Sequence, residues 1–334
     1  MKRVILFLGI LALATPFCTK EDPSGPGWIY DPTPFSVELP DFFPIMEVPA
    51  GNPTTIEGVR LGRMLYYDPI LHKDSAQACA SCHLQTLSFS TPGNILPHIN
   101  LAWSSAFLWN GKIQGSLEDV MYFESAEFFK TDLTRLQNHP DYPKRFYEAF
   151  GKKEVTYENI AKALSQFFRI MVSYNSKYDS YIDPNQFVFL EDEELMGFDI
   201  FFSEKGDCFH CHGGILFTDN RFHNNGLEAD PEPGLFEITG DPEDVGRFKT
   251  PTLRNIELTG PYMHDSRYET LEEVIDFYSE GLEQSPTVDP LMKNVFQGGV
   301  HLTPQEKGHL IAFLKTLTDT VYVQNEALSN PFQP

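Results

Sequence analysis

The pattern of apolar residues predicts helices in several parts of the chain, and no region stands out as strand-rich. Near the C-terminus, Thr303 and Glu306 form a capping box with proline at the first helical position, which predicts where a helix begins. Thr270 and Glu273 form a second capping box ahead of another apolar stripe. Two further segments have a helical pattern, 159–173 and 191–203.

The N-terminus has the pattern of a targeting segment. Lys2 and Arg3 precede an apolar run over 4–17, which is shorter than the roughly 20 residues that span a bilayer but suits a signal peptide. Cys18 follows where a bacterial lipoprotein is cleaved and acylated, although the three residues before it match the usual small-residue sequence poorly. We interpret residues 1–18 as a lipoprotein signal peptide; an ordinary signal peptide with a stray cysteine is the alternative.

Residues 19–54 contain recurrent prolines and few periodic apolar positions, which predicts an extended tether between a lipid and a folded body. The acidic residues directly after Cys18 resemble the export signal of surface lipoproteins in some Gram-negative bacteria. We therefore expect a periplasmic or cell-surface protein, anchored to the outer membrane through lipid alone.

Length and charge narrow the class of protein. The chain has 334 residues, which is long enough for two domains. Hydrophobic residues make up 41% and charged residues 22%, a composition typical of packed globular proteins. Its formal net charge of −22 argues against nucleic acid or an anionic membrane surface as a partner. The same charge would attract a basic donor protein, but it is also a common route to solubility.

Four of the five cysteines form two C-x-x-C pairs, each followed at once by histidine. These are Cys79, Cys82 and His83 in the first motif, and Cys208, Cys211 and His212 in the second. C-x-x-C-H is the attachment signature of haem c. Its spacing lets two thiols reach the vinyl groups of one porphyrin, while the histidine binds the iron.

Other uses of these cysteines fit less well. Two-residue disulfides would staple a chain of this length poorly, even in an oxidising compartment. A four-cysteine zinc site has its pairs closer together than Cys82 and Cys208 are. A thioredoxin-like motif would not explain a histidine after both pairs. The sequence therefore predicts two covalent haems.

Small haem c domains bury the cofactor among a few short helices and long loops. We therefore expect a mainly α fold of two tandem cytochrome c-like haem domains. A boundary is expected near 175–190, which gives an N-terminal domain over 55–180 and a C-terminal domain over 181–325.

The motifs resemble those of the bacterial dihaem cytochrome c peroxidase/MauG family. In the first half the similarity lies in 60–69 (RLGRMLYYDP) and the first haem motif. In the second half it lies in the second haem motif, 216–223 (LFTDNRFH), 246–255 (GRFKTPTLRN) and 261–265 (PYMHD). The resemblance implies that the first haem reacts with hydrogen peroxide and that the second stores or relays electrons from a small donor protein, a cytochrome c or a cupredoxin.

The resemblance also assigns roles to single residues. His83 and His212 are the expected proximal iron ligands, and Trp109 is the expected electron bridge between the haems. Three residues fall at the family's interdomain calcium site, where oxygen ligands suit a hard cation: Asn94, Thr259 and Pro261. Without the resemblance, Trp109 would be interpreted as a core aromatic residue and Asn94 as a turn residue.

The sixth ligand of the second haem has two candidates. Tyr278 lies where the peroxidases carry methionine and the MauG branch carries tyrosine. A phenolate is a hard anionic ligand that stabilises oxidised iron, and the axial ligand is a main control on haem potential. Met263 is a softer alternative nearby in the sequence, and Tyr278 also fits as a plain core residue of its helix.

The region expected to carry the acid/base residue departs from the family. Peroxide cleavage needs a group that moves a proton between the two oxygens, and the family places a glutamate there after a glutamine. Here Val120 takes the glutamine position and the segment is about three residues short. We favour Glu127 for the role and place Glu124 second; an exposed acidic turn is the alternative for either.

The loop after the first haem is a second departure. Peroxidases of the family have a longer loop with a histidine that caps the resting haem, whereas no histidine lies between His83 and Asn94. We expect the first haem to lack this cap, although His98 could still supply a second histidine ligand.

Two classes of function follow. The first is an enzyme that reduces hydrogen peroxide, or a MauG-like variant that oxidises a partner through high-valent iron, which Tyr278 and the missing cap favour. The second is a dihaem electron carrier without catalysis, which Val120 and the shortened segment favour. A haem-based sensor would need a partner domain for which the chain offers no sign.

Overall fold

The computed structural model describes residues 27–93 and 95–333. Cys18, the expected signal peptide and Asn94 therefore lie outside the described residues. Among the described residues, no helix combines the length and the apolar character that crossing a bilayer requires.

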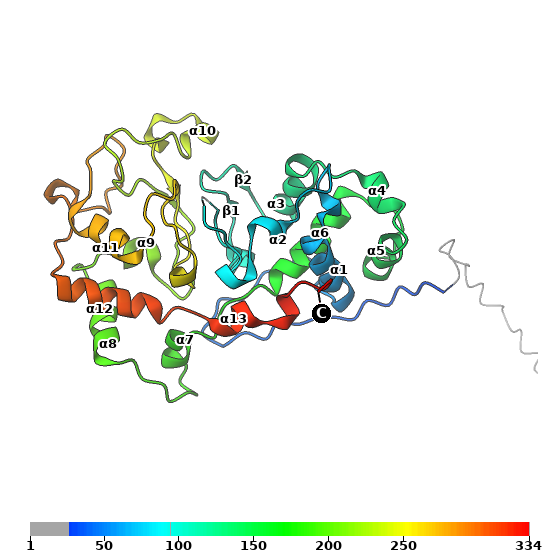
Figure 1. Cartoon of the computed structure of the whole chain (residues 1–334), viewed down its shortest axis with the longest axis horizontal. Coiled ribbons are helices and arrows are strands. Elements are labelled where there is room, and N and C mark those ends of the chain that lie inside the picture. The colour runs from blue at the N-terminus through cyan, green and yellow to red at the C-terminus, as the bar shows by residue number, and fades with distance from the viewer. Residues whose placement is uncertain (1–26, 94, 334) are drawn as a thin grey trace, which may run out of the picture.

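Two pairs of helices that cross closely form the centres of the two halves of the molecule (Figure 1). In the first half α1 (Ile56–Tyr67) crosses α6 (Tyr157–Arg169), and in the second α8 (Asp192–Phe201) crosses α12 (Pro304–Lys315). A glycine allows each crossing, because a Cβ added to Gly62 or to Gly197 would lie 2.0 Å from a carbonyl oxygen of the facing helix. The two halves therefore repeat one design in tandem, as the sequence predicts.

The remaining elements are short. The other helices are α2 (Cys79–Cys82), α3 (Leu117–Phe123), α4 (Leu133–Gln137), α5 (Tyr142–Phe150), α7 (Lys177–Ile182), α9 (Phe209–His212), α10 (Phe236–Thr239), α11 (Leu271–Glu280) and α13 (Thr320–Gln324). A π-helical turn, η4 (Glu124–Phe128), follows α3. The 3-10 turns are η1 (Pro69–Leu71), η2 (Gln85–Leu87), η3 (Leu101–Trp103), η5 (Pro242–Asp244), η6 (Ile256–Leu258), η7 (Val295–Gln297) and η8 (Glu326–Leu328).

Strands in the described chain are confined to two antiparallel ladders. One joins β1 (Ala106–Phe107) to β2 (Ile113–Gln114), with Phe107 opposite Ile113. The other joins β3 (Phe222–His223) to β4 (Phe248–Lys249), with His223 opposite Phe248. The mainly α class predicted from the sequence is confirmed.

Both capping boxes predicted from the sequence are present. The Thr270 side chain accepts from the backbone N–H of Glu273 at the start of α11, and Thr303 does the same for Glu306 at the start of α12. The helical patterns at 159–173 and 191–203 correspond to α6 and α8, each a few residues shorter than predicted. Local side-chain chemistry therefore fixes where these helices begin.

The C-terminal segment returns to the first half of the molecule. After α12 the chain runs back across the N-terminal helices (Figure 1), and Tyr322 is buried in their core. The Arg63 guanidinium donates to the carbonyl oxygens of Ser329 at 2.6 Å and Glu326 at 2.8 Å. This segment therefore ties the two halves together.

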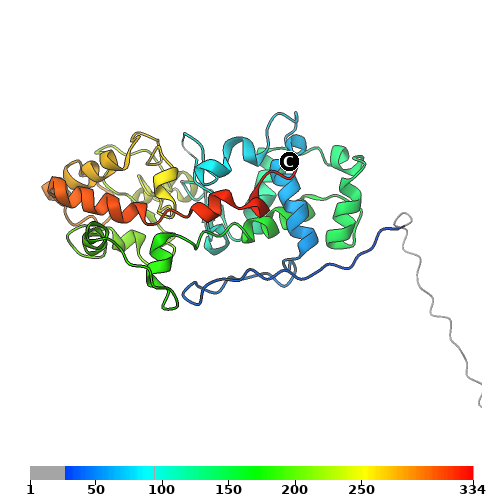
Figure 2. The ribbon, with the colours of Figure 1, turned by 60° about the horizontal axis from the view of Figure 1, so that its bottom comes forward.

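The described part of the expected tether, residues 27–54, packs against the body along one side (Figure 2). The Trp28 ring lies 6.0 Å from that of Tyr147. Phe43 is buried, with its ring 5.7 Å from Trp103 and 4.9 Å from the Arg254 guanidinium. The backbone is largely extended, as the sequence predicts, but its aromatic side chains attach it to both halves.

Candidate haem sites

The first C-x-x-C-H motif places its histidine ready to bind a metal. Cys79 and Cys82 are the ends of α2, and the His83 N–H donates to the Cys79 carbonyl. The Nδ1 of His83 lies 2.8 Å from the Phe89 carbonyl oxygen. Burial lowers the pKa of His83 to about 4, although the bond to Phe89 opposes this. The imidazole is therefore neutral, and a bond from Nδ1–H to a carbonyl leaves the other nitrogen free for iron.

The second motif repeats this arrangement. His212 ends α9, and its Nδ1 lies 3.1 Å from the carbonyl oxygen of Phe217. Burial lowers the pKa of His212 as well. Phe89 and Phe217 both have left-handed backbone, with φ of 57° and 51°, so each loop turns its carbonyl back toward the histidine. The two motifs therefore present their histidines in the same way.

The structure argues against two alternative uses of the cysteines, a disulfide framework and a shared zinc site. The four cysteines of the motifs form no disulfide. The two pairs lie in different halves of the molecule, so they cannot share one zinc ion. Within the described chain, the one cluster with metal-binding geometry is Glu204, Asp207 and His210, at the surface, and Lys293 already binds its three side chains.

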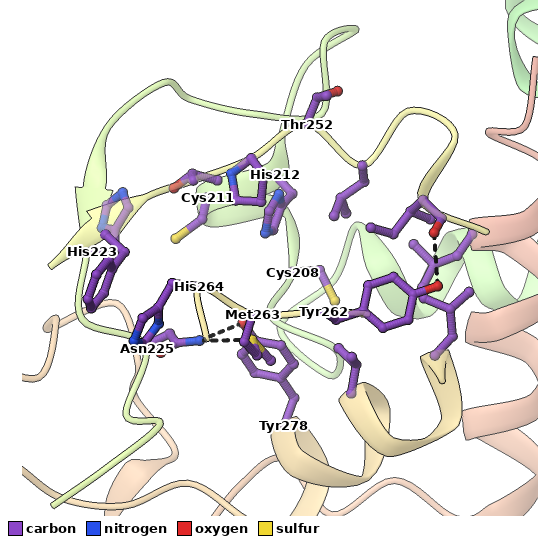
Figure 3. Close-up of a pocket in the computed structure, with 18 of the residues that line it drawn as sticks. Cys208, Cys211, His212, His223, Asn225, Thr252, Tyr262, Met263, His264 and Tyr278 are labelled. Atoms are coloured by element: carbon purple, nitrogen blue, oxygen red, sulfur yellow. Dashed lines mark hydrogen bonds between the residues drawn. The ribbon is translucent and has the colours of Figure 1, made fainter. Parts of the chain in front are cut away.

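A large apolar cavity surrounds the second motif (Figure 3). Cys208, Cys211 and His212 line it together with aliphatic and aromatic side chains. Two buried ring nitrogens in its lining, Trp109 Nε1 and His264 Nε2, have no hydrogen-bond partner. An apolar macrocycle whose carboxylates accept hydrogen bonds fits such a lining. The residues present therefore suit a haem.

Both candidates for the sixth ligand reach this cavity. In Figure 3, Tyr278 and Met263 lie on the side of the cavity opposite His212. Tyr278 comes from α11. Burial raises the pKa of its hydroxyl to about 12, although a hydrogen bond from Asn225 counteracts the shift. Met263 comes from a loop, where its φ of 71° is unusual for a methionine. The structure places both residues at the cavity and does not by itself decide which one is the sixth ligand.

Trp109 links the two halves at the edge of the same cavity. It belongs to the loop between β1 and β2, yet its carbonyl accepts a 2.8 Å hydrogen bond from the backbone N–H of Lys249 in β4. Gly111, with φ of 68°, lets this loop approach Phe222, whose ring would lie 2.4 Å from a Cβ at that position. A residue of the first half is thereby held in the lining of the second haem site.

Several residues of the cavity were not predicted from the sequence. Lys249 is buried and donates to Asn220 at 2.7 Å, and burial lowers its pKa to about 8. Both ring nitrogens of His223 bind carboxylates, Asp219 at 2.8 Å and Asp289 at 2.7 Å. Burial alone would lower the pKa of His223, but these contacts and Cys211 raise it to about 11. Lys249 lies inside motif 246–255 and His223 inside motif 216–223. Their place in these motifs is the sequence feature that could have pointed to them.

The two candidate acid/base residues of the first site lie in very different surroundings. Glu124 is partly buried at the start of the π-helical turn, and burial raises its pKa to about 7. It is close enough that its charge, after burial, is the next cause raising the pKa of the Cys79 thiol. Glu127 is exposed on the far part of the turn. The structure thus places Glu124, and not Glu127, in partly buried surroundings beside the first haem motif.

The π-helical turn explains why Glu127 is exposed while Glu124 is partly buried. Val120, at the family's glutamine position, is buried in the core, and a residue four positions later shares its helix face. Glu124 therefore follows Val120 inward, and in a regular α-helix Glu127 would return to that face as well. The turn is instead closed by a bond from the Phe129 N–H to the Glu124 carbonyl, one residue wider than an α-turn. The extra residue rotates Glu127 outward.

His98 lies against the proximal histidine of the first site. Its ring stacks on that of His83, and its Nδ1 lies 3.1 Å from the Tyr66 hydroxyl. Two ligands of one haem iron approach from opposite faces of the porphyrin, which stacked rings cannot do. In this structure His98 therefore lies beside His83 and not opposite it, which is not the position of a second histidine ligand.

The expected calcium site is described only in part. Thr259 and Pro261 line the large cavity, and so do Gly93 and Ile95, the neighbours of Asn94 in the chain. The Thr259 hydroxyl donates to the Ile256 carbonyl at 3.3 Å, which leaves lone pairs on its oxygen. The described residues of the expected site therefore line one cavity, and calcium there stays a prediction.

Comparison with known proteins agrees with these sites. A family model described as di-haem cytochrome c peroxidase matches residues 56–186. The methylamine utilization protein MauG of Methylorubrum extorquens is 32% identical over 295 residues, covering 80% of each chain. The cytochrome c551 peroxidase of Nitrosomonas europaea is 30% identical over 301 residues, covering 82% of this chain and 84% of that protein.

Solved structures share the fold. The crystal structure of a MauG-like protein associated with microbial copper homeostasis is 32% identical, with a TM-score of 0.82 over 90% of this chain and 100% of that one. The diheme peroxidase BthA of Burkholderia thailandensis is 18% identical, with a TM-score of 0.66 over 90% of this chain and 100% of that one, and shares the fold alone.

Two haem c sites on tandem cytochrome c-like halves define a dihaem cytochrome. The chain belongs to the dihaem cytochrome c peroxidase/MauG family. It is therefore an oxidoreductase of the peroxidase or MauG kind, with haem c as its cofactor.

Proposed function

We propose that hydrogen peroxide reacts at the first haem and that Glu124 is the acid/base residue of this reaction. The observation that carries the proposal is the partly buried position of Glu124 beside the first haem motif, where burial raises its pKa to about 7. A group with this pKa is present in both protonation states near neutral pH. It can take a proton from one peroxide oxygen and return it to the other.

The overall reaction consumes two electrons and two protons per peroxide and yields two waters. The haem supplies the electron transfer, and the protein supplies the proton path and the dry surroundings. Glu124 is followed by Ser125, which is fully buried and donates its hydroxyl to the Tyr122 carbonyl. The turn around Glu124 is therefore held by the protein's own bonds, which keeps the carboxyl in place for both proton transfers.

The experiment is a pair of matched substitutions. Glu124→Gln is expected to lower peroxide turnover by 10²-fold or more, the usual contribution of a positioned acid/base group. Glu127→Gln makes the same chemical change three positions later at an exposed site, and turnover is expected to remain within about twofold. If both variants retain turnover, the acid/base group lies elsewhere. An unmodified protein that exchanges electrons but does not turn over peroxide would be an electron carrier, the function that Val120 favours.

A MauG-like variant of this function is the second candidate. In it the oxidising power generated at the first haem is used on a partner protein. Tyr278 in the second haem site favours this candidate, because a phenolate ligand stabilises oxidised iron. Steady-state assays with a reduced cytochrome c or cupredoxin as donor separate the two. A peroxidase oxidises the donor rapidly, with two electrons taken from the donor for each peroxide consumed. A MauG-like enzyme oxidises the same donor slowly.

In both variants Trp109 is proposed as the electron bridge between the haems. Support comes from its position, since it belongs to the first half yet lines the second haem site. Its unpartnered Nε1 is available to a haem carboxylate.

A calcium ion is proposed at Asn94, Thr259 and Pro261. Support comes from Thr259, Pro261 and the chain neighbours of Asn94, which line the same cavity, and carbonyl and hydroxyl oxygens suit a hard cation. Metal analysis of the purified dihaem protein is expected to find one calcium per chain. Chelation is expected to change the absorption spectrum of the second haem, because Thr259 and Pro261 line its cavity; less than one calcium per chain would reject the site.

Export and lipidation at Cys18 are proposed as well. Covalent haem c attachment, together with the signal-like N-terminus, supports a periplasmic or cell-surface protein anchored to the outer membrane. Mass spectrometry of the mature protein tests this, since Cys18 should be the first residue and carry lipid. Cys18→Ser is expected to release a soluble dihaem protein.

A further inference from the structure

Asn225 contacts both candidate ligands of the second haem. Its amide nitrogen lies 3.1 Å from the Tyr278 hydroxyl oxygen and 3.8 Å from the Met263 sulfur (Figure 3). The amide has two N–H donors and can serve both atoms at once. The Asn225 side chain is therefore placed to influence which of the two residues binds the iron.

The backbone on both sides of Asn225 is fixed. His223, two residues before it, is bound by carboxylates on both ring nitrogens. The Asn224 side chain donates to Ser285 and Thr287 at 3.0 Å each. Gly226, with φ of 72°, accepts from the Glu283 N–H at 2.8 Å. The amide of Asn225 is therefore presented to the cavity from a rigid support.

The two contacts differ in strength. The bond to the phenol oxygen has ordinary hydrogen-bond length, whereas an N–H bond to a thioether is long and weak. An oxygen that accepts one such bond still has a lone pair for iron, and the bond fixes its direction. The Met263 sulfur, held by the same amide, stays near the cavity but is restrained from moving toward the iron. Met263 carries a further constraint in its left-handed backbone.

We propose that Asn225 is a positioning residue that gives the sixth position of the second haem to Tyr278 and holds Met263 back. The proposal rests on the proposed function, in which Tyr278 is that ligand. Without Asn225 the softer sulfur competes for the iron. Thioether ligation raises haem potentials, whereas a phenolate lowers them. The equilibrium for reduction of the second haem therefore reports which ligand is bound.

The test uses the purified dihaem protein and three variants. Asn225→Leu keeps the size of the side chain and removes the donors. It is expected to change the electron paramagnetic resonance spectrum of the second haem and to make its reduction easier by at least tenfold, or 59 mV for one electron. Combining it with Met263→Leu is expected to abolish the easier reduction, because the competing sulfur is gone. Met263→Leu alone is expected to leave the spectrum unchanged.

Two results would overturn the proposal. One is a second haem whose spectrum and potential are the same in Asn225→Leu as in the unmodified protein. The other is an easier reduction that persists in the double variant, since Met263 could not then be the competitor. Tyr278→Phe tests the underlying assignment separately. If it leaves the second haem unchanged, Tyr278 is not the ligand; if it changes the haem while Asn225→Leu does not, Asn225 alone has been misassigned.

Discussion

The rings of His83 and His98 stack face to face, with centroids 3.4 Å apart and planes 15° apart. His98 is held in this position from two sides. The Tyr66 hydroxyl lies 3.1 Å from its Nδ1, and the Tyr322 hydroxyl donates to its carbonyl oxygen. Because Tyr322 belongs to the returning C-terminal segment, the second half of the chain helps to orient the proximal ligand of the first haem.

Removing the His98 ring is expected to loosen His83 and to destabilise the first half. His98→Leu deletes the stacked ring and leaves the fully buried Tyr66 hydroxyl without its nearest partner, a cost of about 1–3 kcal/mol. The resonance lines of the first haem are expected to broaden as the imidazole plane becomes less defined. Urea unfolding and electron paramagnetic resonance measure the two effects.

The His98→Phe variant separates the loss of stability from the loosening of His83. It retains an aromatic ring on His83 but offers no acceptor to Tyr66, so it is expected to lose stability while keeping narrow lines. Equally narrow lines in His98→Leu would show that the stack does not orient His83.

Peroxide turnover is expected to rise with pH through about 7. Glu124 must be deprotonated to accept the first proton from peroxide, and burial raises its pKa to about 7. A pH profile of kcat/KM for hydrogen peroxide should therefore increase through neutrality and then level off. The Glu127→Gln variant should keep this profile, whereas Glu124→Gln should be low and flat. A rise in Glu124→Gln with the same midpoint would assign the titration to another group.

The same shift predicts the sign of a stability effect. A carboxyl whose pKa is raised in the folded protein binds its proton more tightly there than in the unfolded chain. Glu124 therefore favours folding below its unfolded pKa, and this contribution is lost as the pH rises from about 4.5 through about 7. Urea unfolding of Glu124→Gln should show a smaller loss of stability over this range than the unmodified protein.

Sequence reasoning succeeded where the determinant is local. The haem motifs consist of adjacent residues, and the capping boxes at Thr270 and Thr303 span four positions each. It could not foresee that Glu124 and Glu127 differ in exposure, because the π-helical turn that separates them leaves no mark in apolar spacing. It also could not foresee that Phe43 packs between the halves or that Asn225 meets Tyr278, since these contacts join residues far apart in the chain.

The glycines at the helix crossings are expected to be intolerant of any side chain. A Cβ at Gly62 would lie 2.0 Å from the Ala163 carbonyl oxygen, and one at Gly197 would lie 2.0 Å from that of His309. Gly62→Ala and Gly197→Ala should each destabilise by about 1–3 kcal/mol or more, because the helices must separate. Gly308, on α12, has open space around it. Gly308→Ala should instead stabilise by about 0.5–1 kcal/mol, as alanine does within a helix. Chemical denaturation of the three variants measures this contrast, and equal losses at all three glycines would contradict the close crossings.

Trp109→Phe is expected to slow electron exchange between the haems. Trp109 reaches from the first half into the lining of the second haem site, and its Nε1 has no protein partner. Phenylalanine fills much of the same space but is harder to oxidise and has no N–H for a haem carboxylate. Exchange is expected to slow by about tenfold, or about 1.4 kcal/mol in activation free energy.

Trp103→Phe provides the matched control for this prediction. Trp103 lies in the same segment, but it packs on Phe43 and its Nε1 donates to the Pro44 carbonyl, outside the haem cavity. Stopped-flow reduction of one haem, followed at the absorption bands of both, gives the exchange rate in each variant. A Trp103→Phe protein that exchanges electrons normally beside a slow Trp109→Phe protein would assign the path to Trp109. Equal rates in both would place the path elsewhere, because the two substitutions disturb the same segment and only one of them reaches the second haem site.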